Sequence, residues 1–194
     1  MNPKDYFRNH PPRNIAGYNI QSADIPGFRF DGHPAISEIR AKMPGLPIHG
    51  PENFNTIFQI SCTCGSDRYY IIGFEWLNPD FNNTKLLLSP LSLRCVACDK
   101  VTDLFDSQIH GYDAELGNGS STERGKGIKT EYGCPQCDRQ ALQIYVRYEH
   151  SDELLKYNDP KSGEQPQNLY SWFSLVGKCN SCSQYYPVTD FECA

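Results

Sequence analysis

Apolar and polar residues alternate along several stretches of the chain, and a period of two residues predicts β-strands. The clearest alternation puts Leu142, Ile144, Val146 and Tyr148 on one face of a strand. Residues 69–76, 86–94 and 170–178 are rich in aromatic, β-branched or leucine side chains, which also favour strands. We therefore expect a mainly β protein with small α content.

The predicted strands occur in two similar groups. Residues 56–106 contain, in order, a cysteine pair, a strand, a loop, a return strand and a second cysteine pair. Residues 130–194 repeat this order, and the sequence after the last pair of each group is similar, with VTDLFD at 101–106 and VTDFE at 188–192. Similar tails at equivalent places predict an internal repeat of two modules.

The remaining two segments differ from the modules. Eight of the fourteen prolines fall by position 51, so residues 1–55 are expected to form an irregular, Pro-rich wrap. One short helix is predicted at residues 34–43, where Pro34 suits the first helical position and Pro44-Gly45 ends the helix. Residues 107–129 between the modules are rich in Gly, Ser and Asn in their second half and are expected to form a loop or linker.

Eight of the nine cysteines lie in four short motifs, which indicates metal binding. Two thiolates separated by a tight turn can bind one ion, and a second such turn completes a tetrahedral site with four sulfurs. Four motifs in one chain predict two such sites, although four thiolates suit iron as well as zinc. The expected ligands are Cys62, Cys64, Cys95, Cys98, Cys134, Cys137, Cys179 and Cys182.

The turn residues agree with this interpretation. Gly65, Asp99 and Asp138 each follow a cysteine pair, and Gly and Asp tolerate positive φ better than most residues. Four disulfides are the alternative, but nine cysteines and the lack of a signal-peptide pattern in residues 1–16 argue against a secreted disulfide protein. Cys193 is expected to be a free thiol, or else a substitute ligand.

This arrangement resembles the zinc-ribbon, or rubredoxin-like knuckle, class over residues 60–192. The resemblance implies two tandem antiparallel zinc-ribbon modules with one zinc ion each. It implies Cys62, Cys64, Cys95 and Cys98 as ligands of one ion, and the other four paired cysteines as ligands of the second. A cross-braced pairing, first motif with third and second with fourth, is the alternative, but local closure costs less loop entropy. The single residue between Cys62 and Cys64 departs from the usual spacing of two.

Charge narrows the choice of partners. The formal net charge is −5, and two zinc ions with four thiolates each would take it to about −9. An acidic chain argues against a nucleic-acid partner, and no apolar run approaches the length of a membrane span. We expect a cytoplasmic protein that binds another protein.

Outside the cysteines, the best candidate for an interaction or secondary site gathers an imidazole, a phenol and two carboxylates: His110, Tyr112, Asp113 and Glu115. Such a group could bind a metal or exchange protons, whereas a polar turn is the simpler interpretation. The strand aromatics, among them Tyr69, Trp76 and Phe173, are expected in the core, and Glu149 in a solvated loop.

Three functions remain open from the sequence. A protein-interaction or adaptor module with two structural zinc ions is favoured, and no catalytic residue is assigned. A nucleic-acid-associated ribbon protein could use exposed aromatics to stack bases. A redox or metal-handling protein would use the irregular Cys62 motif together with Cys193, or else the His110 group.

Overall fold

The computed structural model describes residues 2–25, 53–78, 84–110, 124–151 and 165–193. Its helices are α1 (Pro3–Asn9), α3 (Ser107–His110) and the 3-10 turns η1 (Arg13–Ile15) and η5 (Pro166–Asn168). Its strands are β1 (Asn19–Ser22), β2 (Asn53–Ser61), β3 (Arg68–Asn78), β4 (Thr84–Cys95), β5 (Val101–Phe105), β6 (Thr130–Tyr132), β7 (Leu142–Ser151), β8 (Trp172–Cys179) and β9 (Tyr185–Glu192). The predicted mainly β fold is confirmed.

A short N-terminal helix is also present, at Pro3–Asn9. Asn2 caps it, because its side chain accepts a hydrogen bond from the backbone N–H of Lys4 at 2.9 Å, and Pro3 occupies the first turn. The helix predicted at residues 34–43 lies outside the described residues. None of the described helices has the length and apolarity that a membrane crossing requires.

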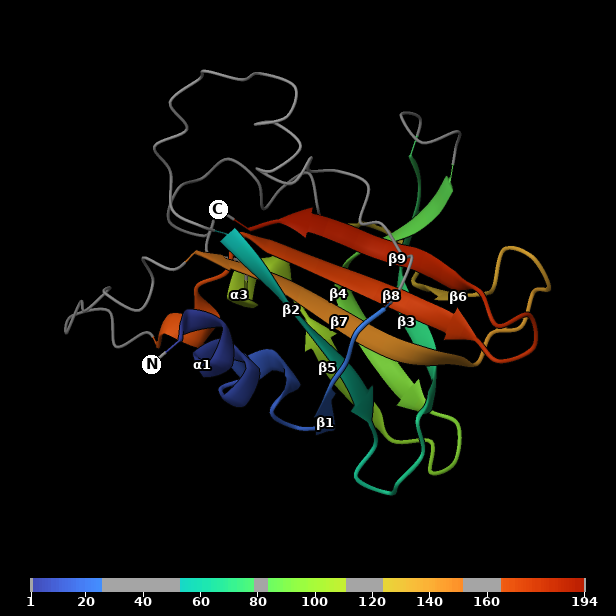
Figure 1. The fold of residues 1–194 in the computed structure, drawn as a ribbon. Coiled ribbons are helices and arrows are strands. Elements are labelled where there is room, and N and C mark those ends of the chain that lie inside the picture. Colours follow the sequence, from blue (N-terminus) through green and yellow to red (C-terminus); the bar gives the residue numbers. More distant parts are fainter. Residues whose placement is uncertain (1, 26–52, 79–83, 111–123, 152–164, 194) are drawn as a thin grey trace, which may run out of the picture.

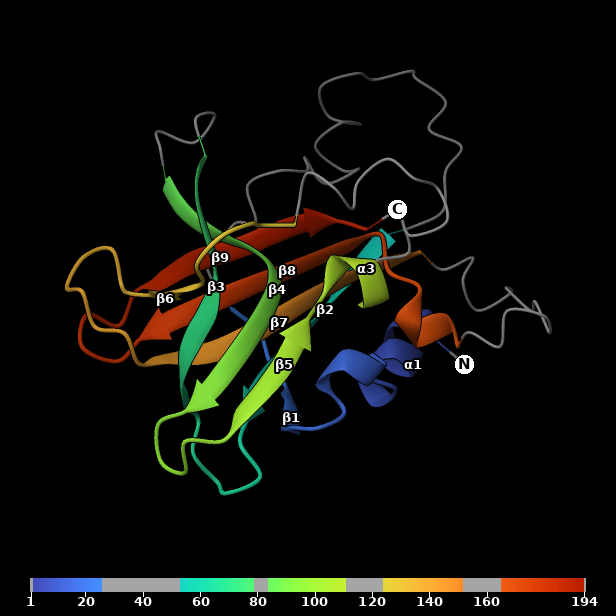
Figure 2. The same ribbon diagram turned by 180° about the vertical axis from the view of Figure 1, so that it is seen from behind.

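The strands form one antiparallel sheet that is folded into two layers (Figures 1 and 2). One layer contains β1, β2, β7, β8 and β9, and the other contains β6, β3, β4 and β5. The layers are joined where β3 meets β7, with Tyr69 paired to Leu142. The core lies between them, and the rings of Phe105 and Phe173 stack there at 4.1 Å.

The alternation in β7 sets which side chains enter this core. Leu142, Ile144, Val146 and Tyr148 are fully buried between the layers, as the period of two predicts. The intervening residues of β7 therefore point to the outer face of the same layer.

Strands of the two expected modules pair with each other. β2, from residues 56–106, pairs with β7 over Asn53–Ile60, and β6, from residues 130–194, pairs with β3 at Ile71–Gly73. The strands therefore do not form two self-contained ribbons. A lone two-stranded ribbon is marginally stable in water. Here β2 and β6, the strands that precede the first and third cysteine motifs, each pair with a strand of the other half.

The hydrogen-bond register is the same in both halves. Ile60, two residues before Cys62, faces Ile144, and Tyr132, two residues before Cys134, faces Ile71. The β4–β5 register shifts between Leu91 and Ser92, and the β8–β9 register shifts between Leu175 and Val176. Each shift lies four residues before the cysteine that ends its strand.

The N-terminal segment closes one end of the space between the layers. Phe7 is fully buried, and its ring stacks on His150 of β7 at 4.0 Å. Asn14 links the two layers, because it donates to the backbone O of Leu104 at 3.1 Å and accepts from the hydroxyl of Tyr148 at 3.0 Å. The N-terminal segment therefore contributes buried side chains to the core, among them Phe7, Ile15 and Tyr18.

Candidate metal centres

The eight paired cysteines form two clusters of four sulfurs. Within each cluster all Sγ atoms lie within 4.8 Å of one another. The nearest Sγ pairs are separated by 3.6 Å (Cys62–Cys98), 3.6 Å (Cys64–Cys95), 3.7 Å (Cys134–Cys182) and 3.5 Å (Cys137–Cys179). Four sulfurs bound to one zinc ion at about 2.3 Å would lie about 3.8 Å apart. Both clusters therefore have the spacing of a tetrahedral metal site.

The same distances exclude disulfide bonds in the structure, since bonded sulfurs lie about 2.05 Å apart. They also show how the motifs combine. The first and second motifs share one cluster, and the third and fourth share the other. Each site is closed locally, as the resemblance implied, and the cross-braced alternative is not observed.

The backbone of each motif forms a tight turn, and both cysteines of the turn place their Sγ atoms in the same cluster. The N–H of Cys95 donates to the O of Lys100 at 3.0 Å, and the N–H of Asp99 donates to the O of Cys95 at 3.0 Å. Cys134 and Asp138 make the equivalent bonds at 2.9 and 2.8 Å. The residue after the second cysteine has positive φ in all four turns: Gly65 (93°), Asp99 (56°), Asp138 (53°) and Ser183 (59°). The predicted turn role of Gly and Asp is confirmed, and Ser183 was missed because serine carries a weaker signal.

Backbone N–H groups favour the thiolate form of three cysteines: Cys95, Cys134 and Cys179. Burial alone would raise the pKa of the Cys95 thiol, but hydrogen bonds from the N–H groups of Cys98 and Ala97 lower that pKa to about 6. Cys134 and Cys179 likewise have a lowered pKa, because backbone N–H bonds in their turns outweigh burial. Thiolates are the form that binds metal, so these turns favour binding at Cys95, Cys134 and Cys179. In Cys98 and Cys137 a backbone N–H also lowers the pKa, but burial and the neighbouring sulfurs outweigh it and raise the pKa overall.

The first turn is a shortened version of the others. The N–H of Cys62 donates to the O of Ser66 at 2.7 Å, and the N–H of Gly65 donates to the O of Cys62 at 2.8 Å. Each bond spans one residue fewer than its counterparts at Cys95. The sulfur spacing is nevertheless the same as in the second cluster, so the shorter motif still presents both sulfurs to one point.

Cys193 belongs to neither cluster. It is 1% exposed, and its N–H donates to the O of Ser171 at 2.8 Å. It is a buried cysteine that lies outside both groups of four sulfurs, so the expectation of a substitute ligand is not supported.

The candidate secondary site is described only at His110. Its Nδ1 accepts a hydrogen bond from the N–H of Asp106 at 3.0 Å, which places the proton of the neutral ring on Nε2. Burial and the nearby charge of Arg13 lower the pKa of His110. Tyr112, Asp113 and Glu115 lie outside the described residues, so the His110 group stays a prediction.

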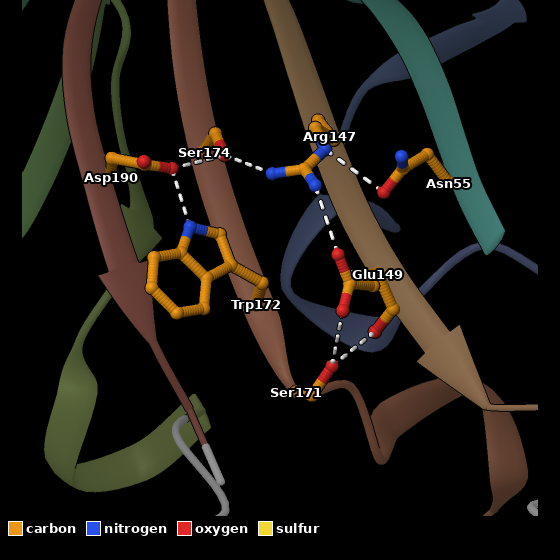
Figure 3. A network of polar contacts seen from close by, with 7 residues as sticks. All are labelled: Asn55, Arg147, Glu149, Ser171, Trp172, Ser174 and Asp190. Atoms are coloured by element: carbon orange, nitrogen blue, oxygen red, sulfur yellow. Dashed lines mark hydrogen bonds and ion pairs between the residues drawn. The ribbon is translucent and has the colours of Figure 1, made fainter. Parts of the chain in front are cut away.

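A polar network that the sequence did not reveal covers the outer face of β7 and its neighbours (Figure 3). The guanidinium of Arg147 donates to Oδ1 of Asn55 at 2.9 Å and to Oγ of Ser174 at 3.0 Å, and it pairs with Glu149 at 3.0 Å. Asp190 accepts from Ser174 and from the indole N–H of Trp172. Glu149, predicted in a solvated loop, is instead a strand residue whose side chain is 15% exposed.

The strand aromatics divide between core and surface. Tyr69 and Phe173 are buried, as expected, whereas Trp76 is 40% exposed on β3. The predicted core role of Trp76 is therefore wrong, because the outer part of β3 extends beyond the two layers (Figure 1).

No protein-family model, curated protein or solved structure matches the chain. The interpretation of the site therefore depends on its geometry and chemistry.

Proposed function

We propose that the protein is a protein-interaction or adaptor module whose fold is held by two structural zinc ions. The observation that carries the metal half of this proposal is the tetrahedral spacing of each sulfur cluster together with the N–H groups that favour thiolates. Four thiolates leave no coordination position for water, which is typical of structural zinc and not of catalytic zinc.

Both metal centres lie where strands end. Each site fixes two turns that lead into four different strands, so one ion ties together the ends of both strand pairs in its half. Structural zinc sites contribute on the order of 10 kcal/mol to folding in small domains. A stabilisation of this size would matter in a small domain, whose core alone supplies little free energy.

Native mass spectrometry of protein purified without chelator tests the metal. We expect a mass increase of two zinc ions, and iron in the same sites would be distinguished by its mass and visible colour. Changing Cys98 and Cys182 to Ser in separate variants should each remove one ion. A metal-free chain that unfolds at the same denaturant concentration as the loaded chain would contradict a structural role.

The protein-binding half of the proposal is supported by the outer part of β3. Beyond Gly73, where its pairing with β6 ends, β3 pairs only with β4 among the described strands. Trp76 and Leu77 on this part are 40% and 54% exposed. An unpaired strand edge beside exposed apolar side chains is suited to bind an extended segment of another protein.

Affinity capture from cell extract, analysed by mass spectrometry, tests this surface. We expect a specific partner that is lost when Trp76 and Leu77 are changed to Ser together. Val101→Ser is the matched control, since Val101 is 56% exposed on β5 and lies away from this edge. A partner retained equally by all variants would overturn the assignment of the surface, and capture of no specific partner would overturn the adaptor role.

A further inference from the structure

A polar groove of ≈ 400 Å³ lies beside the first metal centre. Its wall is formed by β1, by the end of β2 and by the turn that carries Cys62 and Cys64, at the edge of one layer (Figure 1). Its volume is within the range of small-molecule sites, about 300–1,000 Å³. Six of its residues carry the argument: Asn19, Gln21, Gln59, Ser61, Gly65 and Asp67.

The first and third cysteine motifs differ in the side chains that flank them, and this difference bears on the groove. The residue before the first cysteine is Ser61 in the first motif and Gly133 in the third, and the residue after the second cysteine is Gly65 and Asp138 respectively. A Cβ at Gly133 would lie 3.0 Å from Oδ1 of Asp138, whereas a Cβ at Gly65 would meet nothing within 4 Å. The carboxylate of Asp138 thus lies against Gly133 in the third motif, whereas Gly65 places no side chain at the equivalent position of the first motif.

Two polar side chains of the groove are held in place by the protein. The amide nitrogen of Asn19 donates to the O of Cys62 at 3.0 Å, which leaves its Oδ1 available. Oδ2 of Asp67 accepts a hydrogen bond from Gln143, which leaves its Oδ1 available. Such preorganisation lowers the entropy cost of binding.

The other polar side chains supply both donors and acceptors. Gln21 and Gln59 are direct partners across β1 and β2, and Asn19 faces Ser61 in the same register, so all four lie on one face of the sheet. Amide groups donate and accept, and a serine hydroxyl does both. The wall contains no Lys or Arg, so it lacks a counter-charge for phosphate or another anion.

We propose that this groove is a binding site for a neutral carbohydrate. Sugar hydroxyls are both donors and acceptors, and side-chain amides and a carboxylate can each bind two neighbouring hydroxyls. Gly65 lets the ligand approach the backbone of the metal-binding turn. This site is separate from the exposed part of β3, so it does not depend on the adaptor role.

Amide NMR titration of the full, zinc-loaded chain tests the proposal. The probes are maltotriose, cellotriose and triacetylchitotriose, with acetyl-triglycine amide and inorganic phosphate as comparison ligands. We expect at least one sugar to give saturable shifts confined to residues 19–21, 59–67 and their strand neighbours. Saturable shifts with the peptide alone, with phosphate alone, or with none of the probes would overturn the proposal.

Two variants and a matched control assign the site. Gly65→Asn uses the side chain that adopts positive φ most readily after glycine, at a φ of 93°. It adds a side chain of the size of Asp138, so sugar binding should weaken at least about tenfold. Gln21→Ala changes an exposed residue without backbone strain and should weaken binding about fivefold, as expected for one hydrogen bond. Ser183→Asn introduces the same side chain at the equivalent turn position of the fourth motif and should leave binding unchanged. Native mass spectrometry should find two metal ions in every variant, and unchanged affinity in both groove variants would place the ligand elsewhere.

Discussion

Arg147 and His150 lie three residues apart on β7 and are buried on opposite faces of the layer, with 6% and 0% exposure. Arg147 is surrounded by groups that favour its charge: Glu149 pairs with the guanidinium, Asn55 and Ser174 accept hydrogen bonds from it, and the carboxylate of Asp190 lies close by. Among the described residues, no carboxylate acts on the charge of His150. Its Nε2 contacts the O of Gln167 at 3.3 Å, and its ring stacks on Phe7. In the described part of the chain its Nδ1 has no hydrogen-bond partner. Nearby carboxylates offset the cost of burying the charge of Arg147, whereas burial keeps His150 neutral. Arg147 therefore affects stability through its ion pair, and His150 through its protonation.

His150 should make the protein sensitive to mild acid. Burial lowers the pKa of His150 to about 4, from an ordinary value of 6.5. Between these values the unfolded chain binds a proton that the folded chain does not, so the free energy of unfolding falls as pH decreases from about 6.5 to about 4. The full shift corresponds to about 3 kcal/mol.

Urea unfolding of the metal-loaded protein at a series of pH values between these limits measures the effect. His150→Gln keeps a donor for the O of Gln167 but does not titrate, so its unfolding midpoint should change less with pH. Any acid sensitivity that remains in this variant is attributed to protonation of the thiolates and release of metal. Equal pH dependence in both proteins would show that His150 is not the sensor.

Arg147→Met should destabilise the fold strongly. The substitution keeps the length of the side chain but leaves the buried carboxylate of Glu149 without its ion pair, and removal of one partner from a buried pair costs about 3–5 kcal/mol. Urea unfolding at pH 7 measures the loss. Lys178→Met, on the outer face of the adjacent strand β8, should change stability by no more than about 0.5 kcal/mol. Similar losses in the two variants would show that the network adds nothing beyond side-chain packing.

At the scale of elements, local sequence patterns predicted the strands and turns correctly but did not predict which strands pair. The alternation in β7 identified Leu142 to Tyr148 as a core-facing strand, because the side-chain period depends only on neighbouring residues. The cysteine spacing predicted the turns for the same reason. The pairing of β2 with β7 was missed, because alternation states which face is buried but not which strand lies alongside. The burial of Arg147 was missed too, since an outward position in a strand ordinarily faces solvent.

The turn after Cys137 offers a test of this local control. Asp138 has φ of 53°, a conformation in which a β-branched residue is strained by roughly 1–3 kcal/mol. Asp138→Val should therefore weaken metal binding at the second site by about thirtyfold, corresponding to about 2 kcal/mol. Asp138→Gly should bind metal with nearly the original affinity. Competition with a chelator measures both, and equal weakening would indicate that the Asp side chain, not the backbone, is what the turn requires.

At the scale of the molecule, the two halves share strands as well as a core. β2 leads into the first metal centre but is paired with β7 over eight residue pairs. β7 in turn begins at the second centre, where Leu142 faces Cys179. β6 leads into the second centre and is paired with β3 of the first half. Each centre therefore lies at the end of a strand that pairs with a strand of the other half.

Loss of the second metal ion should consequently loosen the first half. In the double variant Cys179→Ser and Cys182→Ser, β7 and β8 lose the turn that holds their ends, and β2 loses its ordered neighbour. Hydrogen exchange should then quicken in β2 (Asn53–Ser61) by a factor similar to that in β8, although no residue of β2 has been changed. Native mass spectrometry provides the control, because the first ion should remain bound at the start of the exchange experiment. If exchange quickened in β8 and β9 while β2 and β3 kept their original protection, the halves would be independent domains, and the reciprocal pairing would not couple them.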